Sequence, residues 1–321
     1  MRKRIFIGLI IMFILVGVAP FLLAINDSVE YGTLPFTNSA FTVVNDVNIH
    51  YRVWMPEEPV IGKILFVHGL AGSTFSWRYT VDTMREAGYA VVTVDLPGFG
   101  YSDRTRGLDH SQTARARYLW ALLEELDQNT MLDTVRNQPW DLVGHSMGGG
   151  TITAMVLAKP HRTRALFYVA GSIDHQPPGI ASSILGLPVI GSWFANVFRF
   201  LFLNPNRINR FLESAYGREL LEYEVIGYLT PLKIKGTQHT FIDITTSRGV
   251  ALEHSLSTIT TPAFLLWGAD DSWVPLNVGH QLADDLLHAE LTIIQGSAHC
   301  PMETHASEFN TWLMESLNLR Q

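Results

Sequence analysis

The stretch that decides the fold is Trp140-Asp141-Leu142-Val143-Gly144-His145-Ser146-Met147-Gly148-Gly149-Gly150. An apolar run ends in Gly-His-Ser-Met-Gly and passes directly into residues 151–157, whose composition predicts a helix. This G-x-S-x-G arrangement predicts a strand, a sharp turn with Ser146 at its tip, and a helix. Gly144 and Gly148 supply the small residues that such a strained turn needs. The turn therefore presents Ser146 as a candidate nucleophile. The alternative is a glycine-rich helix start with an incidental serine, although three glycines open a helix poorly.

The composition describes a packed globular protein. The 321 residues are 47% hydrophobic and 17% charged, enough for one large α/β domain with an insertion or for two domains. A net charge of −7 provides no basic surface for nucleic acid. The single cysteine, Cys300, excludes an internal disulfide, and the histidines match no metal-binding pattern. We therefore expect no metal and no cofactor.

The N-terminus predicts a membrane anchor. Three basic residues at positions 2–4 precede residues 5–25, which carry no charge and can span a bilayer as a helix. A cleaved signal peptide is the alternative, but its apolar region would be shorter, and Pro20 directly follows the small-x-small pattern. The basic end favours a cytoplasmic start with the main body on the exported side, periplasmic or extracellular, or secreted after cleavage. Residues 26–40 indicate a polar linker.

Strand and helix patterns alternate over residues 41–171 and again over residues 249–321. This alternation predicts an α/β fold with a mostly parallel sheet and helices on both faces. Expected strands cover residues 41–44, 47–54, 63–67, 89–95, 141–143, 165–169, 263–267 and 291–294, and expected helices cover 76–87, 111–126, 151–157, 276–287 and 303–317. Residues 172–248 offer several helical pieces and no good strand, and so predict a helical insertion.

Two loops are candidates for an oxyanion hole, which needs two amide donors. One donor is the amide of Met147 at the helix start. The second is expected in His68-Gly69-Leu70-Ala71-Gly72-Ser73, directly after the strand at 63–67, with Leu70 as the candidate. His68 and Gly69 are placed at the substrate site, where His68 is expected to brace the loop rather than transfer protons. An ordinary strand-to-helix turn is the alternative.

An acidic residue is expected after the strand at 263–267. The sequence there is Trp267-Gly268-Ala269-Asp270-Asp271-Ser272-Trp273-Val274-Pro275. A carboxylate at the C-terminal edge of a strand can orient a histidine and stabilise its cation. Asp271 is preferred because it lies four residues before Pro275, whereas Asp270 is interpreted as a solvated turn residue. Asp174, after an earlier strand, is a weaker alternative.

A histidine base is expected after the last strand. His299 lies in the loop Gly296-Ser297-Ala298-His299-Cys300-Pro301-Met302-Glu303, and the order Ser146, Asp271, His299 is the one expected for this kind of nucleophile. The competitor His305 falls inside the expected closing helix. Surface or turn roles suffice for the remaining histidines, such as His50, His110 and His161. Cys300 is interpreted as a small buried neighbour of the base.

Taken together, these motifs resemble the lidded α/β-hydrolases, which include esterases, monoacylglycerol lipases, C–C bond hydrolases, cofactor-free haloperoxidases and epoxide hydrolases. The resemblance runs from Phe41 to the C-terminus. It also covers Asp95-Leu96-Pro97-Gly98-Phe99-Gly100-Tyr101-Ser102-Asp103, which matches the family's D-x-x-G-x-G-x-S turn and is interpreted as structural. The resemblance implies a Ser146, Asp271 and His299 triad. Serine at the elbow argues against haloalkane dehalogenases and epoxide hydrolases, which use aspartate there.

The predicted helical insertion at residues 172–248 indicates both the kind of substrate and a possible contact with the membrane. Residues 176–198 carry no charge, but a single crossing there would place Ser146 and His299 on opposite sides of a bilayer. We therefore expect lid helices, with residues 204–210 as an exposed segment between them. One lid face is expected to rest on the bilayer or simply to pack on the core. Aromatic residues in the lid favour an apolar acyl or aromatic substrate, with contacts from Trp193, Phe194 and Phe198.

The expected activity is hydrolysis of carboxylic esters with apolar acyl groups through an acyl-enzyme. Hydrolysis of C–C bonds, amides or thioesters, acyl transfer and haloperoxidase-like perhydrolysis on the same triad are alternatives. A noncatalytic lipid-binding or receptor protein on the same scaffold is an alternative of another class. Fold alone does not identify the substrate, and the oligomeric state is not indicated.

Overall fold

The computed structural model describes residues 35–57, 59–128, 132–173, 184, 187–202, 205–247 and 252–318. The expected membrane anchor at residues 5–25 and most of the linker lie outside them. Within the described residues, no helix is both long and apolar enough to cross a bilayer.

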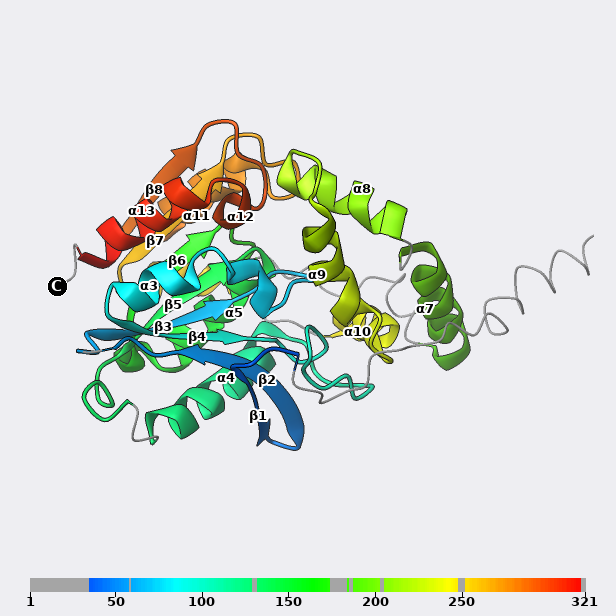
Figure 1. Cartoon of the computed structure of the whole chain (residues 1–321), viewed down its shortest axis with the longest axis horizontal. Coiled ribbons are helices and arrows are strands. Elements are labelled where there is room, and N and C mark those ends of the chain that lie inside the picture. Colours follow the sequence, from blue (N-terminus) through cyan, green and yellow to red (C-terminus); the bar gives the residue numbers. More distant parts are fainter. Residues whose placement is uncertain are drawn as a thin grey trace, which may run out of the picture.

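The described strands form one eight-stranded sheet in the order β1-β2-β4-β3-β5-β6-β7-β8 (Figure 1). β2 pairs antiparallel with both β1 and β4, and every other pairing is parallel. The predicted mostly parallel sheet is therefore confirmed. The strands are β1 (Ser39–Val44), β2 (Val47–Trp54), β3 (Gly62–Val67), β4 (Tyr89–Val94), β5 (Trp140–His145), β6 (Thr163–Val169), β7 (Ala263–Gly268) and β8 (Ala289–Ile294).

Helices cover both faces of the sheet because the central strands are apolar on both sides. All residues of β3, β4 and β5 are buried, as expected for a parallel sheet between two helix layers. One core cluster packs against α4 (Gln112–Asp127), α5 (Met147–Ala158) and α11 (Leu276–Asp285). The other packs against α3 (Val81–Glu86) and α13 (Ala306–Asn318). Two short 3₁₀ turns, η3 (Pro160–Arg162) and η4 (Glu253–Thr258), precede β6 and β7.

Two expected helices are broken in the structure. The helix predicted at 76–87 is divided into η1 (Thr74–Trp77) and α3. The hydroxyl of Ser73 caps η1 by accepting a hydrogen bond from the amide of Phe75. Helical structure therefore begins at Thr74, before the expected start at residue 76. The closing helix is divided into α12 (Pro301–Thr304) and α13 by His305, whose φ of −128° and ψ of 47° are not helical. His305 therefore lies between two helices, not inside one.

The segment between β6 and β7 contributes helices α7 (Pro188–Phe202), α8 (Pro205–Tyr216), α9 (Glu222–Leu232) and α10 (Thr237–Thr246). In Figure 1 these helices lie together on one side of the sheet, in green to yellow. Residues 205–210 belong to α8, so the prediction that this segment lies between helices is wrong, although Asn206, Arg207 and Arg210 are exposed as expected. The segment is an amphipathic part of the helix: Ile208 is buried in a core cluster shared with the sheet, while those three polar residues are exposed.

Candidate active site

Ser146 occupies a strained turn between β5 and α5. Its φ of 50° and ψ of −120° are rare for a residue with a side chain. Backbone hydrogen bonds hold it there. The Ser146 amide donates to the Val169 carbonyl at 3.0 Å, and its own carbonyl accepts from the Ser172 amide at 2.9 Å. The end of β6 and the residues after it therefore fix the serine from the side.

The glycines on either side of the serine are required by close backbone contacts. A Cβ at Gly144 would lie 2.6 Å from the Gly148 carbonyl oxygen, and a Cβ at Gly148 would lie 2.4 Å from the Val67 carbonyl oxygen. Neither neighbour is a flexible side chain that could move aside. The turn is thus pressed against the end of β3, where the candidate oxyanion loop begins.

Asp271 and His299 form a buried pair. Nδ1 of His299 lies 2.8 Å from Oδ2 of Asp271. The other carboxylate oxygen, Oδ1, accepts from the amides of Trp273 at 2.8 Å and Val274 at 2.9 Å. The aspartate is therefore oriented by its own turn. Its neighbour Asp270 is exposed, and Asp174 lies outside the described residues.

His145, the variable residue of the G-x-S-x-G pattern, supports the His299 loop. Its Nε2–H donates to the His299 carbonyl at 2.9 Å, and the two rings lie 4.8 Å apart. Burial, together with the charge of His299, lowers the pKa of His145 well below its usual value. The ring is therefore neutral near pH 7. Sequence reasoning missed this contact because nothing in the motif links residues 145 and 299.

The helical insertion is bonded directly to the His299 loop. The His299 amide donates to the Ala215 carbonyl of α8 at 2.9 Å. Trp273 stacks on the imidazole of His299 with ring centroids 5.4 Å apart, and its indole N–H donates to the hydroxyl of Ser214 at 2.9 Å. Two consecutive residues of α8 thus contact the histidine or the ring that covers it.

The loop after β3 approaches the serine closely. A Cβ on Gly69 would lie 2.9 Å from Cβ of Ser146, so only glycine allows this approach. His68 is fully buried: its Nδ1–H donates to the Gly69 carbonyl at 2.7 Å, and its Nε2 accepts from the Leu96 amide at 3.0 Å. Both ring nitrogens are used, and burial lowers the pKa of His68. His68 therefore braces the loop and is not among the residues that line the pocket.

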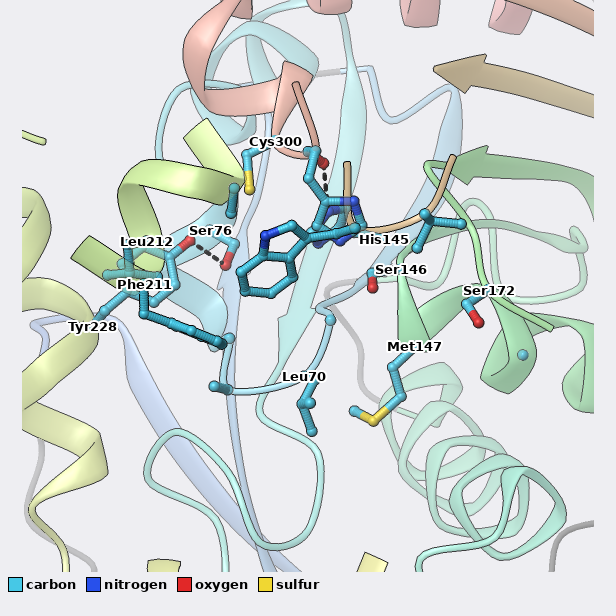
Figure 2. A pocket seen from close by; sticks show the side chains of 18 of the residues that line it. Leu70, Ser76, His145, Ser146, Met147, Ser172, Phe211, Leu212, Tyr228 and Cys300 are labelled. Atoms are coloured by element: carbon cyan, nitrogen blue, oxygen red, sulfur yellow. Dashed lines mark hydrogen bonds between the residues drawn. The ribbon is translucent and has the colours of Figure 1, made fainter. Parts of the chain in front are cut away.

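The candidate residues meet at a pocket of about 350 Å³. Figure 2 shows Ser146 between two groups of side chains, with Phe211, Leu212 and Tyr228 on one side and Met147 and Ser172 on the other. His299, Gly69 and Leu70 also line it. The apolar side comes from α8 and α9, together with Trp273 and Val274.

The aromatic residues expected to contact substrate lie elsewhere. Trp193 and Phe194, in α7, pack on each other with ring centroids 4.9 Å apart. Neither is among the residues that line the pocket, and Phe194 is 44% exposed. The side chain of Phe198 lies outside what the structure describes. Phe211 and Leu212 of α8 supply the apolar wall instead. The sequence did not indicate this, because residues 204–210, just before them, are mostly polar.

The turn that begins at Asp95 is structural, as interpreted. It also contacts His50, for which the sequence analysis expected a surface or turn role. The Asp95 carboxylate is fully buried and accepts from Nδ1 of His50 at 2.7 Å and from the amides of Thr74 and Tyr101 at 2.6 and 2.7 Å. Burial opposes ionisation, yet these partners hold the pKa of Asp95 below its usual value. His50 is completely buried, so a surface role for it is wrong.

Cys300 borders the pocket but is a poor nucleophile. Burial and the neighbouring carboxylate of Glu303 raise the pKa of its thiol well above the usual value. Glu303 itself is buried and accepts hydrogen bonds from the hydroxyls of Tyr216 and Tyr228 and from Arg78. This cluster links α8 and α9 to the core just after His299.

Known proteins match over most of the chain. Residues 63–306 match the family model described as alpha/beta hydrolase fold. A 2-hydroxy-6-oxononadienedioate/2-hydroxy-6-oxononatrienedioate hydrolase of Paraburkholderia phymatum is 28% identical, with 85% of this chain and 91% of the relative aligned. The structure is similar to an esterase from Exiguobacterium antarcticum (TM-score 0.69, 17% identity, 87% of this chain and 98% of the other). It is also similar to a bromoperoxidase from Bacillus anthracis (TM-score 0.68, 22% identity, 87% and 99%). The chain therefore belongs to the alpha/beta hydrolase fold family and is a hydrolase.

Proposed function

We propose that this hydrolase cleaves carboxylic esters with apolar acyl groups through a Ser146, His299 and Asp271 triad. One observation carries the proposal: His299, which a buried 2.8 Å contact joins to Asp271, lines the same pocket as Ser146, a serine in a strained turn. A nucleophile, a base and a carboxylate that orients the base are the elements of acyl transfer.

In the proposed mechanism, Oγ of Ser146 attacks the ester carbonyl while Nε2 of His299 removes its proton. The amides of Leu70 and Met147 donate to the oxyanion that forms. The tetrahedral intermediate then collapses, and His299 returns the proton to the departing alcohol. Water, deprotonated by the same histidine, then attacks the acyl-enzyme. The bond to Oγ of Ser146 breaks, His299 returns the proton to Oγ, and the acid is released. Asp271 keeps the proton on Nδ1 of His299, so that Nε2 is free to act as base.

The preference for apolar acyl groups rests on the wall made by α8 and α9. Phe211, Leu212 and Tyr228 form one side of the pocket, and burial of apolar substrate surface against them favours binding. The helices α7 to α10 are proposed to act as a lid. Neither proposal depends on contacts from α7.

Two measurements test the proposed activity. The purified protein should hydrolyse p-nitrophenyl esters and should react with a fluorophosphonate probe at Ser146, whereas Ser146→Ala should do neither. A matched control is Ser172→Ala, which removes a neighbouring hydroxyl in the same pocket and should keep the probe reaction. Equal labelling of Ser146→Ala and the wild type would reject the serine as nucleophile, and an unlabelled wild type would favour a binding protein.

Hydrolysis of a C–C bond is the second candidate, and the similarity to the 2-hydroxy-6-oxononadienedioate/2-hydroxy-6-oxononatrienedioate hydrolase of Paraburkholderia phymatum favours it. The same serine, histidine and oxyanion donors would serve that reaction. A panel of p-nitrophenyl esters beside a vinylogous 1,5-diketo acid separates the two activities through the ratio of kcat/KM values.

We also propose that residues 5–25 anchor the protein in a membrane, with the hydrolase domain on the exported side. Only the sequence supports this: an uncharged run of bilayer length after three basic residues. The full chain should remain in the membrane fraction after alkaline carbonate washing, and a variant lacking residues 2–25 should not. Release of the full chain by the wash would contradict the anchor.

A further inference from the structure

Arg115 of α4 is a buried cation that has no partner among the described residues. It is only 4% exposed, and its Nε makes no hydrogen bond. Asp109, the carboxylate whose charge acts on it, lies 3.9 Å from Arg117 instead. The guanidinium carries five N–H donors, and leaving such a charge buried and unpaired costs several kcal/mol.

Arg104 is a second buried arginine, and its bonds show a structural role. Arg104 is 7% exposed, and its guanidinium donates to Thr237, Ser102, Gly100 and Pro231. Each of its three nitrogens thus has an acceptor within the protein. No bond of this kind links the side chain of Arg115 to any residue that the structure describes.

Arg115 faces the same pocket as Ser146. It lines the pocket together with Gln112, one helical turn earlier on α4, and with Gly150 and Ser172. Residues three apart on a helix share a face. A Cβ on Gly150 would lie 3.2 Å from Cγ of Gln112, so this face of α4 packs on the first turn of α5. Oε1 of Gln112 is also buried without a donor. Nε of Arg115 and Oε1 of Gln112, both in this corner, thus have no hydrogen-bond partner among the residues that the structure describes.

The cation remains charged and its field extends through the corner. Burial lowers the pKa of Arg115 to about 10, which still leaves it protonated at neutral pH. After burial, the charge of Arg115 is the next largest cause that lowers the pKa of His110, and it also lowers that of His68 beneath the oxyanion loop. Apart from the charge of Asp109, an anion entering this corner would meet a positive charge that no described carboxylate pairs with, at low dielectric.

We infer that Arg115 binds a carboxylate of the substrate, and that this protein therefore acts on carboxylate-bearing compounds. Carboxylate oxygens match the planar fork of a guanidinium and would satisfy donors that the fold leaves open. The inference rests on the proposed hydrolase function. Because the apolar acyl group is assigned to the wall of α8 and α9, the carboxylate belongs to the other part of the substrate, the departing alcohol.

Matched esters test this assignment. The hexanoyl esters of hydroxyacetate, 3-hydroxypropanoate and 4-hydroxybutanoate place a carboxylate at graded distances, and the corresponding primary amides are neutral controls. We expect kcat/KM to favour at least one carboxylate over its amide by about tenfold or more, the effect of a charge-assisted hydrogen bond. Arg115→Met should remove this preference by lowering kcat/KM for the carboxylate esters far more than for the amide esters. Arg115→Lys should retain part of it.

The control variant is Arg117→Gln, which removes the same charge from an arginine that is 72% exposed on the same helix. It should keep the preference. Arg115→Met should unfold at a temperature no lower than the wild type, because it removes an unpaired buried charge. A lower unfolding temperature together with equal losses for both ester classes would mean a structural role and would overturn the inference.

A binding measurement separates this inference from the proposed function. Calorimetry of the same esters with Ser146→Ala should show tighter binding of the carboxylate than of the amide, and the double variant Ser146→Ala/Arg115→Met should not. Equal binding of the two esters by Ser146→Ala overturns the carboxylate site even if the wild type is an active esterase. Preferential binding without any turnover by the wild type supports the site and rejects the proposed ester hydrolysis.

Discussion

Replacing Glu303 by glutamine should destabilise the protein by about 3 kcal/mol, because this carboxylate joins three separate elements. It accepts from Tyr216 of α8, Tyr228 of α9 and Arg78 beside η1, and it is buried. The substitution keeps the size of the side chain and removes its charge. The effect can therefore be calculated from the bonds alone, without a cavity.

The magnitude follows from what remains after the change. A hydrogen bond to a charged group contributes about 1.5–3 kcal/mol and one to a neutral group about 1 kcal/mol, so the two tyrosine bonds lose about 2 kcal/mol together. Arg78 loses one carboxylate but keeps Glu224, whose Oε1 lies 3.1 Å away. We assign about 1 kcal/mol to that loss, well below the 3–5 kcal/mol expected when a buried charge loses its sole partner.

Urea unfolding followed by circular dichroism measures this difference. The midpoint should fall at unchanged m-value. Glu308→Gln provides the control, since Glu308 is exposed on α13 and should change the free energy of unfolding by less than about 0.5 kcal/mol. If Glu303→Gln behaved like Glu308→Gln, the cluster would not stabilise the junction between insertion and core.

Three further predictions concern the site and its surroundings. Asp271→Asn should lower kcat by about 10⁴-fold without changing the fold, while Asp270→Asn should not; the reverse result in ester assays would make Asp270 the acid. Gly69→Ala should strongly reduce kcat, because its new Cβ would lie 2.9 Å from Cβ of Ser146; wild-type kinetics in this variant would place the loop farther from the serine. Burial lowers the pKa of His110 to about 4, so the neutral ring stabilises the fold fully above about pH 6.5, and this stabilisation decreases as the pH falls from 6.5 towards 4. His110→Gln should remove up to about 3 kcal/mol of that acid sensitivity, seen as a flatter dependence of the unfolding free energy on pH; an unchanged slope would contradict a buried neutral histidine.

The sequence was sufficient to predict features that depend on neighbouring residues. β2 begins and ends at the residues expected, and the turn before it occurs at Asn45 and Asp46, whose φ values of 48° and 63° suit a tight hairpin. The elbow at Ser146 was predictable because its glycines and serine are adjacent in the chain. Motif spacing also distinguished Asp271 from Asp270, although their burial could be learned only from the structure.

What could not be predicted depends on contacts between distant residues. The support of His299 by His145 joins positions 154 residues apart, and the buried pair of His50 and Asp95 spans 45 residues. Arg115 was not singled out, because no local pattern reveals that a side chain has no partner among the described residues. The apolar pocket wall in α8 was also not predicted. The first turn of that helix is polar, and the sequence does not show that the residues after it reach the pocket.

The hydrogen bond from the His299 amide to the Ala215 carbonyl has a consequence for engineering. Exchanging residues 172–248 for the insertion of a relative is an obvious way to change specificity. In this protein, such a chimera would also replace the acceptor that positions the loop after β8. A working graft must therefore carry that loop together with the transplanted helices, and selection for new specificity should yield compensating changes near residues 297–300.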